Sequence, residues 1–215
     1  MKIARSLERQ LERLFEGPAR RVFSGQVHPS ELAEGLSREA DLARYQHLTG
    51  PATANEYQVL LNPRDLESDP ARIETQLEEV LDIFCATNGL RLEGPARVSL
   101  VADPSTPAGQ FRCEHDIRPG PLHPWARLSG DTMFDVGPNR ALIGRGDDCD
   151  IRLALDEVSR RHAVVHREHG HVYVTDLGSS NGTFVDGARA GTEPVRLVFG
   201  SLLTLASSRF RFLQV

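Results

Sequence analysis

Cysteine is scarce in this sequence, and long apolar runs are missing. The three cysteines, Cys85, Cys113 and Cys149, are an odd number at wide spacing, which is typical neither of a disulfide framework nor of a CxxC metal site. No stretch is long enough to span a bilayer, and the first residues lack the apolar core of a secretion signal. We therefore expect a cytoplasmic protein without direct membrane insertion, and we leave open that a partner recruits it to the inner face of the membrane.

Signatures of common enzymes are missing as well. The sequence has no P-loop, kinase signature or dinucleotide fingerprint. Ser159, His162 and either Asp156 or Asp176 could be combined into a hydrolase triad, but no Gly-x-Ser-x-Gly surrounds the serine. We therefore assign no catalytic residue and keep a serine hydrolase only as a lesser alternative.

Metal and nucleic-acid binding are not expected either. Four histidines, at positions 162, 166, 169 and 171, lie within ten residues. His162 and His166 would share one face of a strand while the other two flank a hairpin tip, so they are not expected to converge on a metal. The net charge of -5 argues against nucleic-acid binding over the whole surface. We predict no metal, no cofactor and no nucleic-acid partner.

Residues 1–113 predict an α+β domain. Apolar side chains recur at helical spacing between Ile3 and Phe23, and again after Pro29. The later elements follow in the order strand, helix, strand, strand, expected over residues 56–61, 70–88, 96–101 and 110–113. The sequence therefore predicts a domain of two helices followed by strand, helix, strand and strand (β-α-β-β).

A linker is expected over residues 114–126. Pro119, Pro121 and Pro124 interrupt any regular pattern there. Such a segment is predicted to be extended and rather stiff.

Residues 127–215 predict an all-β domain. Short apolar runs follow one another, and glycine, asparagine or aspartate separates nearly all of them. The runs lie at residues 141–143, 151–153, 162–165, 172–174, 183–185, 195–199, 202–205 and 210–213. This pattern is typical of an antiparallel sandwich whose loops carry function.

Three polar motifs fall on the connections between these runs. They are Gly144-Arg145, Ser159-Arg160-Arg161-His162 and the segment from Asp176 to Thr183, which reads Asp-Leu-Gly-Ser-Ser-Asn-Gly-Thr. Arginine offers a planar fork of donors to a phosphate, serine adds a hydroxyl, and Gly/Asn/Ser loops can turn backbone N–H groups toward an anion. The motifs therefore indicate a receptor that holds a phosphate.

The order and spacing of these motifs resemble the forkhead-associated (FHA) domain, a β-sandwich family that binds phosphothreonine peptides. The resemblance implies a sandwich of about 10–11 strands. It implies that Arg145 and Ser159 bind the phosphate, that Arg160 adds a basic contact, that Ser180 lies beside the phosphate, and that Asn181 bonds the peptide backbone. Gly144, His162 and Gly182 would support the site. Two departures are Asp186, where the family often has Asn, and Gly200-Ser201, where many members have Gly-Asp.

The first half also resembles a known family. The run Val27-His28-Pro29-Ser30-Glu31-Leu32-Ala33, with the later Asn55-Glu56-Tyr57 and Asp103-Pro104-Ser105, is similar to the N-terminal domain of FhaA-type bacterial FHA proteins. That resemblance implies a non-catalytic adapter in Ser/Thr kinase signalling, linked to cell-envelope or division control. Its partners would be phosphothreonine proteins, such as a Ser/Thr kinase or its substrates.

Two further expectations follow from these resemblances. An alternative to the adapter is a structural assembly protein whose FHA domain has become degenerate. Self-association is the second expectation. Thr49 and Thr53 lie in a Gly/Pro-containing segment that we expect to be an accessible loop, so they are candidate phosphosites that the phosphate receptor of a second chain could capture.

Overall fold

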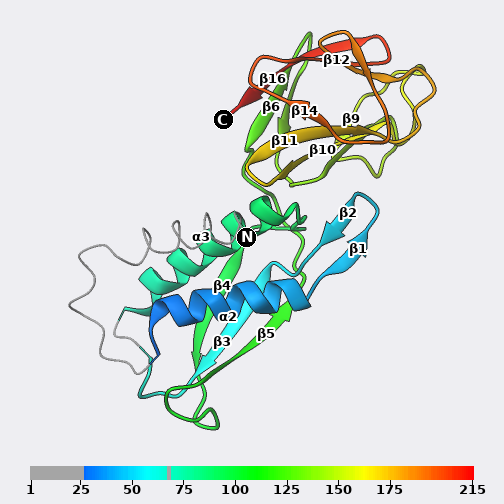
Figure 1. Ribbon diagram of the computed structural model, residues 1–215. Coiled ribbons are helices and arrows are strands. Elements are labelled where there is room, and N and C mark those ends of the chain that lie inside the picture. Colours follow the sequence, from blue (N-terminus) through cyan, green and yellow to red (C-terminus); the bar gives the residue numbers. More distant parts are fainter. Residues whose placement is uncertain (1–26, 67–68) are drawn as a thin grey trace. The chain divides into compact units, whose positions relative to one another are not determined.

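The chain forms two compact units in the computed structural model, which describes residues 27–66 and 69–215. Of the described residues, the first unit comprises 27–45, 52–66, 69–85 and 92–120 (Figure 1). The second comprises Gln46–Pro51, Ala86–Arg91 and Pro121–Val215. The helix expected between Ile3 and Phe23 lies outside the described residues.

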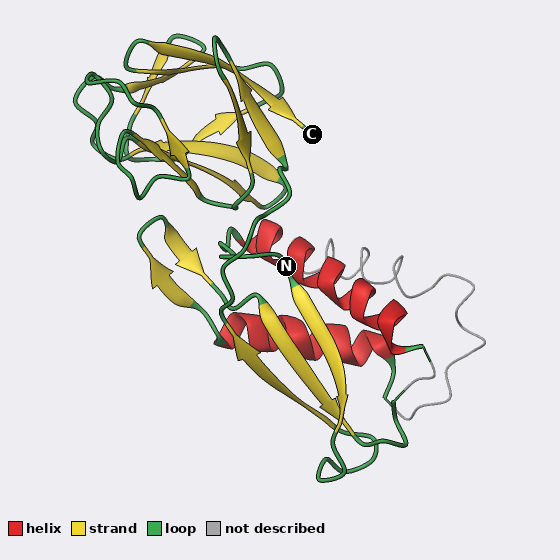
Figure 2. Cartoon of the chain, turned by 180° about the vertical axis from the view of Figure 1, so that it is seen from behind, coloured by secondary structure: helices red, strands yellow, loops and turns green. Residues whose placement is uncertain are grey.

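The first unit is a three-stranded sheet with two helices on one face (Figures 1 and 2). Strand β3 (Glu56–Leu61) is central, parallel to β4 (Arg97–Ala102) and antiparallel to β5 (Phe111–Asp116). The helices are α2 (Pro29–Leu42) and α3 (Pro70–Asn88). The predicted α+β order of helix, strand, helix, strand, strand is therefore confirmed for the described residues.

The ends of the helices follow from their sequences. At the start of α2 the Nδ1 atom of His28 accepts a bond from the Ser30 N–H, and Pro29 occupies the first turn, where its missing N–H costs nothing. Helix α3 ends at Asn88 and is followed by Gly89 at φ 65°, a left-handed conformation that favours glycine. Each helix buries one apolar face, with Leu36 and Leu77 completely buried.

The segment expected as a linker over residues 114–126 is shorter than predicted. Its first three residues belong to β5, and Ala126 already belongs to strand β6. Arg118 is also tied to the first unit, because its N–H and C=O both bond the buried side chain of Asn55, at 2.9 and 3.0 Å. The three prolines of this segment gave no sign of these long-range bonds.

The expectation of an accessible loop around Thr49 and Thr53 is wrong. Strands β1 (Tyr45–His47) and β2 (Gly50–Ala52) form a hairpin there. Thr49 is only 6 % exposed and Thr53 is completely buried, with its hydroxyl donating to the Ala40 carbonyl at 2.7 Å. Neither threonine is presented to a kinase in this fold.

The second unit is a sandwich of two sheets, as predicted. The sheet orders are β14-β11-β10-β8-β9 and β13-β12-β15-β16-β6-β7, so eleven strands lie between Ala126 and Gln214. Their bounds are β6 Ala126–Ser129, β7 Met133–Val136, β8 Ala141–Gly144, β9 Ile151–Arg152, β10 Ala163–Glu168, β11 His171–Asp176, β12 Thr183–Val185, β13 Ala188–Ala190, β14 Val195–Leu197, β15 Leu202–Leu205 and β16 Ser208–Gln214.

The core of this unit lies between its sheets. Alternate residues of the strands point inward, so that Val165 and Val174 of one sheet and Leu203 and Phe212 of the other are completely buried in one cluster. Each apolar run identified in the sequence overlaps a strand, whereas β6, β7 and β13 correspond to none of those runs. The loops at the ends of these strands carry the three polar motifs.

None of the described helices combines the length and apolar character needed to cross a membrane.

Candidate functional site

Arg145 follows directly after strand β8, and Gly144 allows a neighbouring loop to approach it closely. A Cβ atom at Gly144 would lie 2.2 Å from the carbonyl oxygen of Arg160, so only glycine fits there. The N–H of Arg145 donates to the Ser159 carbonyl and that of Gly146 to the Arg160 carbonyl, both at 3.0 Å. These bonds bring Arg145 beside the second motif.

His162 braces that second motif from inside the sandwich. It is completely buried, its Nδ1 accepts the Ser159 N–H at 3.2 Å, and its Nε2 lies 3.1 Å from the Gly182 carbonyl. Both contacts suit a neutral ring with its proton on Nε2. His162 thus joins the loop before β10 to the loop before β12.

A buried carboxylate organises the third loop. Asp176 accepts bonds from the N–H groups of Gly178 and Ser179 and from the hydroxyls of Ser179 and Thr183, at 2.6 to 2.9 Å. Burial opposes its ionisation, but the bonds from Ser179 and Thr183 outweigh it and lower the pKa of Asp176. Gly178 and Gly182, at φ 77° and 80°, supply the left-handed turns.

Ser180 and Asn181 are exposed and connect the loops to each other. The Ser180 N–H donates to the Ser159 Oγ at 3.1 Å, and the Asn181 amide donates to the Glu157 carbonyl at 2.7 Å. The Ser159 hydroxyl therefore keeps its own hydrogen for another acceptor, and the Asn181 Oδ1 can still accept a bond.

The arginines around this site fall into two groups. Arg145, Arg152, Arg160 and Arg161 line one hollow together with Asp147 and Asp148. Arg161 donates from Nε and Nη2 to Asp148, at 2.9 and 2.7 Å, and Arg152 pairs with Asp147 at 3.1 Å. The bonds from Arg161 lower the pKa of the Asp148 carboxyl.

Arg145 and Arg160 are different from their neighbours. Neither side chain makes a hydrogen bond or ion pair with any residue in the described part of the chain. Their guanidinium groups therefore leave positive charge unneutralised in one hollow, and positive charge of this kind attracts anions. The family resemblance named Arg160 as the additional basic contact, and the bonds from Arg161 to Asp148 give a physical reason to prefer Arg160 to Arg161.

The hydrolase constellation is not assembled. His162 contacts the backbone N–H of Ser159, not its Oγ, and its other nitrogen faces a carbonyl. Asp176 is engaged by Ser179 and Thr183 instead of by a histidine. Asp176 begins the third sequence motif, but the motif gave no sign that its carboxylate holds the loop in shape.

The described residues also contain no cluster of three or more His, Cys, Asp or Glu suited to a metal ion. His162 and His166 are buried, and His166 stacks on Tyr173 with ring centroids 5.5 Å apart. His169, at φ 52°, forms the turn of the β10–β11 hairpin.

Comparison with known proteins places two family models on the chain. The model described as FhaA, N-terminal domain, matches residues 5–114, and the FHA domain model matches residues 141–206. All eight site residues predicted from the sequence lie within the second match.

Individual relatives match mainly the second half. The FHA domain-containing protein FhaB of Mycolicibacterium smegmatis is 43 % identical over 70 residues, which are 33 % of this chain and 44 % of FhaB. Proliferation marker protein Ki-67 of Mus musculus is 35 % identical over 88 residues, 40 % of this chain and 3 % of Ki-67. The chain thus spans less than half of FhaB and a small part of Ki-67. A crystal structure of the FhaA FHA domain complexed with the intracellular domain of Rv3910 aligns at 28 % identity and TM-score 0.36, covering 40 % of this chain and 96 % of that one.

Proposed function

Because this chain belongs to the FhaA family of FHA proteins, we propose that its second unit captures phosphothreonine on partner proteins. The chain then acts as a non-catalytic adapter. The observation that carries the proposal is the pair Arg145 and Arg160, whose side chains have no partner among the described residues although both line one hollow.

Each group of the site has a distinct part in binding. A phosphothreonine carries close to two negative charges at neutral pH, and charge-assisted bonds to it are worth roughly 1.5 to 3 kcal/mol each. Arg145 and Arg160 supply the charge, and the Ser159 hydroxyl adds a neutral donor. Asn181 accepts a bond from the peptide backbone through Oδ1 while its amide stays on Glu157. Ser180 borders the phosphate and holds Ser159 in place.

The arrangement favours holding a phosphate over hydrolysing it. Hydrolysis needs a base that can take a proton from water or from a nucleophile. His162, the nearest candidate by sequence, is buried and has both ring nitrogens against backbone groups. The site therefore presents donors to the phosphate without a base to activate an attacking group.

The family membership suggests a setting for this adapter. We place it in the cytoplasm, in Ser/Thr kinase signalling, where its partners are a kinase or the proteins which that kinase phosphorylates. By its resemblance to FhaA-type proteins, we expect this adapter to act in the control of the cell envelope or of cell division. A partner carrying phosphothreonine at the membrane would recruit the chain to the inner face.

An assembly protein with a degenerate FHA domain is the competing function. Such a protein would bind its partners whether or not they are phosphorylated. The intact set of Arg145, Ser159 and Asn181, with their loops bonded to one another, favours the adapter.

Calorimetric titration with three otherwise identical peptides tests the proposal. The peptides carry phosphothreonine, phosphoserine or unmodified threonine at the same position. Their sequences are taken from proteins that bind the chain in a lysate but no longer bind after the lysate is treated with phosphatase. We expect no binding of the unmodified peptide. Phosphothreonine should bind about fourfold tighter than phosphoserine, because burying one methyl group is worth about 0.8 kcal/mol.

The matched variants are Arg145→Ala and Arg127→Gln. Arg145→Ala should weaken phosphothreonine binding about tenfold to a hundredfold. Arg127→Gln breaks the exposed ion pair between Arg127 and Asp135. Both residues lie in the sheet that does not contain β8, so this variant should leave the affinity for the peptide unchanged. Equal affinity for the phosphorylated and unmodified peptides would favour the assembly protein, and unchanged binding by Arg145→Ala would place the phosphate elsewhere.

A further inference from the structure

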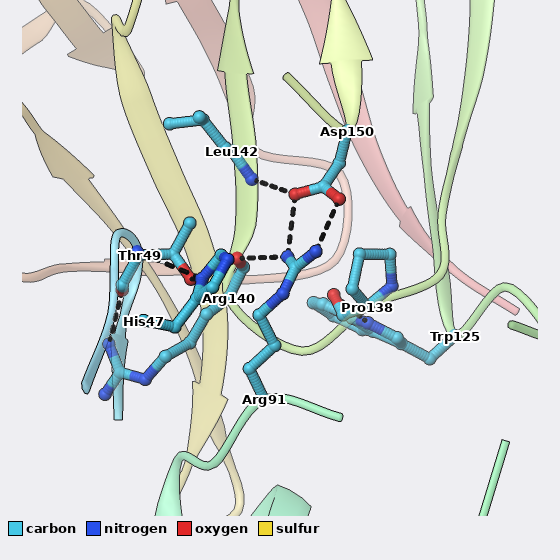
Figure 3. A network of polar contacts seen from close by, with 8 residues as sticks. All are labelled: His47, Thr49, Arg91, Trp125, Pro138, Arg140, Leu142 and Asp150. Carbon is cyan, nitrogen blue, oxygen red and sulfur yellow. Dashed lines mark hydrogen bonds and ion pairs between the residues drawn. The ribbon is translucent and has the colours of Figure 1, made fainter. Parts of the chain in front are cut away.

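Arg91 belongs to the second unit although it lies outside the range matched by the FHA family model. Its Nη1 and Nη2 donate to the two carboxylate oxygens of Asp150, each at 2.8 Å, and Nη1 also donates to the Arg140 carbonyl at 3.1 Å (Figure 3). This fork-to-fork geometry is the most directional form of an ion pair.

The two groups that Arg91 holds mark the beginnings of two paired strands. Arg140 immediately precedes β8, and Asp150 immediately precedes β9. The strands are parallel neighbours, with Ile143 opposite Ile151. Asp150 Oδ2 also accepts the Leu142 N–H at 2.7 Å, so the carboxylate bridges Arg91 and strand β8 (Figure 3).

The connection between these strands is the phosphate-binding loop of the proposed site. The connection is residues 145–150; the loop itself is residues 145–149, and Asp150 joins it to β9. A short loop cannot change shape freely when both of its flanking strands are fixed. The clamp on Asp150 therefore restricts where the Arg145 guanidinium can lie.

Arg91 is itself held firmly within the second unit. Its backbone N–H donates to the Pro51 carbonyl at 3.0 Å. The neighbouring Leu90 carbonyl accepts from the Asn139 amide at 3.1 Å, and the Thr87 carbonyl accepts from the His169 N–H at 2.8 Å. The Arg140 side chain donates to the Gly89 carbonyl and, at 3.4 Å, to the Thr49 carbonyl.

The burial of the pair gives the clamp its strength. The Arg91 side chain is 8 % exposed and that of Asp150 is 20 % exposed. Removing one partner of a buried pair leaves the other as an uncompensated charge, which then moves toward water. For Asp150, such a movement shifts the end of the phosphate-binding loop.

We propose that Arg91 is a positioning residue for phosphopeptide binding, acting through Asp150 on the loop of residues 145–149. The expected effect on phosphopeptide affinity rests on the proposed function. The effect of Arg91 on the conformation of the loop can be measured without any ligand. It makes the phosphate site of this chain depend on a side chain from the segment Ala86–Arg91.

Amide hydrogen exchange on the ligand-free full chain tests the hold on the loop. In Arg91→Gln, the amides of Leu142, Gly146 and Cys149 should exchange at least tenfold faster than in the parent chain. The core amides of Val165 and Val174 should change less than threefold. Arg127→Gln serves as the control and should leave both groups unchanged. An equal increase at loop and core amides, or none at the loop, would overturn the proposal.

Phosphopeptide affinity tests the consequence for binding. With the phosphothreonine peptide described above, Arg91→Gln should bind threefold to tenfold more weakly, and Arg91→Lys, which keeps the charge but not the fork, should lie between it and the parent chain. Asp150→Asn, which retains an acceptor for Leu142, should lose a similar factor. The double variant should be no weaker than either single one, whereas multiplied losses would show that Arg91 does not act through Asp150.

The two measurements separate the possible failures. If the parent chain binds no phosphothreonine peptide, the proposed function is wrong, and the exchange of the loop amides still decides whether Arg91 holds the loop. If the parent chain binds and Arg91→Gln binds equally tightly, the positioning role is wrong and the proposed function stands.

Discussion

The hydroxyl of Ser201 donates a hydrogen bond of 3.1 Å to the carboxylate of Asp186. Both residues stand where the resemblance to the FHA family led us to expect another residue, Asn at position 186 and Asp at position 201. The other oxygen of Asp186 accepts the Leu202 N–H at 2.8 Å, and Asp186 itself sits at φ 50° in the turn between β12 and β13. Because Ser201 supplies a donor to the carboxylate at position 186, we expect the two departures to compensate each other.

Placing a second carboxylate there should destabilise the second unit. Ser201 is 4 % exposed, so the added charge of Ser201→Asp would face Asp186 with little water between them. We expect Ser201→Asp to lower the free energy of unfolding by about 1 to 3 kcal/mol. Adding Asp186→Asn should recover much of that loss. Urea unfolding followed by fluorescence of Trp125, the only tryptophan of the chain, measures both; a double variant no more stable than Ser201→Asp would contradict the compensation.

Arg160 and Arg161 should contribute unequally to binding although they are neighbours. The Arg161 guanidinium is held by Asp148, whereas that of Arg160 has no partner among the described residues. Arg160→Ala should therefore weaken phosphothreonine binding about tenfold, and Arg161→Ala less than about threefold. Titration of both variants with one peptide checks this order. A larger loss for Arg161→Ala would mean that the phosphate displaces Asp148.

The second unit should lose stability in weak acid because of His166. His166 is only 3 % exposed. Burial and the positive charge of Arg140 lower the pKa of His166, and the carboxylate of Glu168 raises it; the net effect is a pKa of about 4. The unfolded chain takes up the proton near pH 6.5, but the folded unit does not until about pH 4. The free energy of unfolding is therefore not reduced by His166 above pH 6.5, and it decreases as the pH falls from 6.5 to about 4 because the unfolded chain binds the proton first.

His166→Phe removes this titration and keeps a ring to stack on Tyr173. Its unfolding free energy, followed through Trp125, should fall less between pH 6.5 and 4 than that of the parent chain. The difference should be at most about 3 kcal/mol, since one pKa unit corresponds to about 1.4 kcal/mol. Parallel pH profiles for the two proteins would show that His166 titrates normally in the folded unit.

Two buried asparagines should stabilise different units. Asn55 bonds the carbonyls of Pro95 and Arg118 and the N–H of Arg118, in the first unit. Asn139 makes the same three kinds of bond in the second unit, to the Leu90 and Arg167 carbonyls and the Arg167 N–H. Each replacement by alanine leaves three backbone groups unsatisfied and should cost about 2 to 4 kcal/mol.

The spectroscopic probe separates the two asparagines. Most of the described helix lies in the first unit and Trp125 lies in the second. Asn55→Ala should mainly shift the unfolding transition seen by circular dichroism at 222 nm, and Asn139→Ala the one seen by tryptophan fluorescence. Equal shifts of both probes in each variant would show that the units unfold together.

Local patterns in the sequence predicted what depends on neighbouring residues. The short apolar runs that include Val165 and Val174, separated by turn residues, predicted strands, because such runs are too short for helices and end where the chain can turn. Pro29 and Gly89 predicted helix ends through the backbone conformations they favour. Three spaced motifs predicted the loops that carry Arg145, Ser159 and Asn181.

Contacts between distant segments were decided by the tertiary structure alone. Thr53 looked accessible because glycine and proline surround it, yet its hydroxyl lies against the Ala40 carbonyl and it is completely buried. Arg161 and Arg160 look alike in sequence, and only the return of the loop that carries Asp148 pairs one of them. Arg91 had no signal at all, because its partner Asp150 is 59 residues away. Periodicity and turn chemistry act over a few residues, so the sequence determined the strands and loops of this protein, whereas the folding of the chain decided which charges are paired and which are left for a ligand.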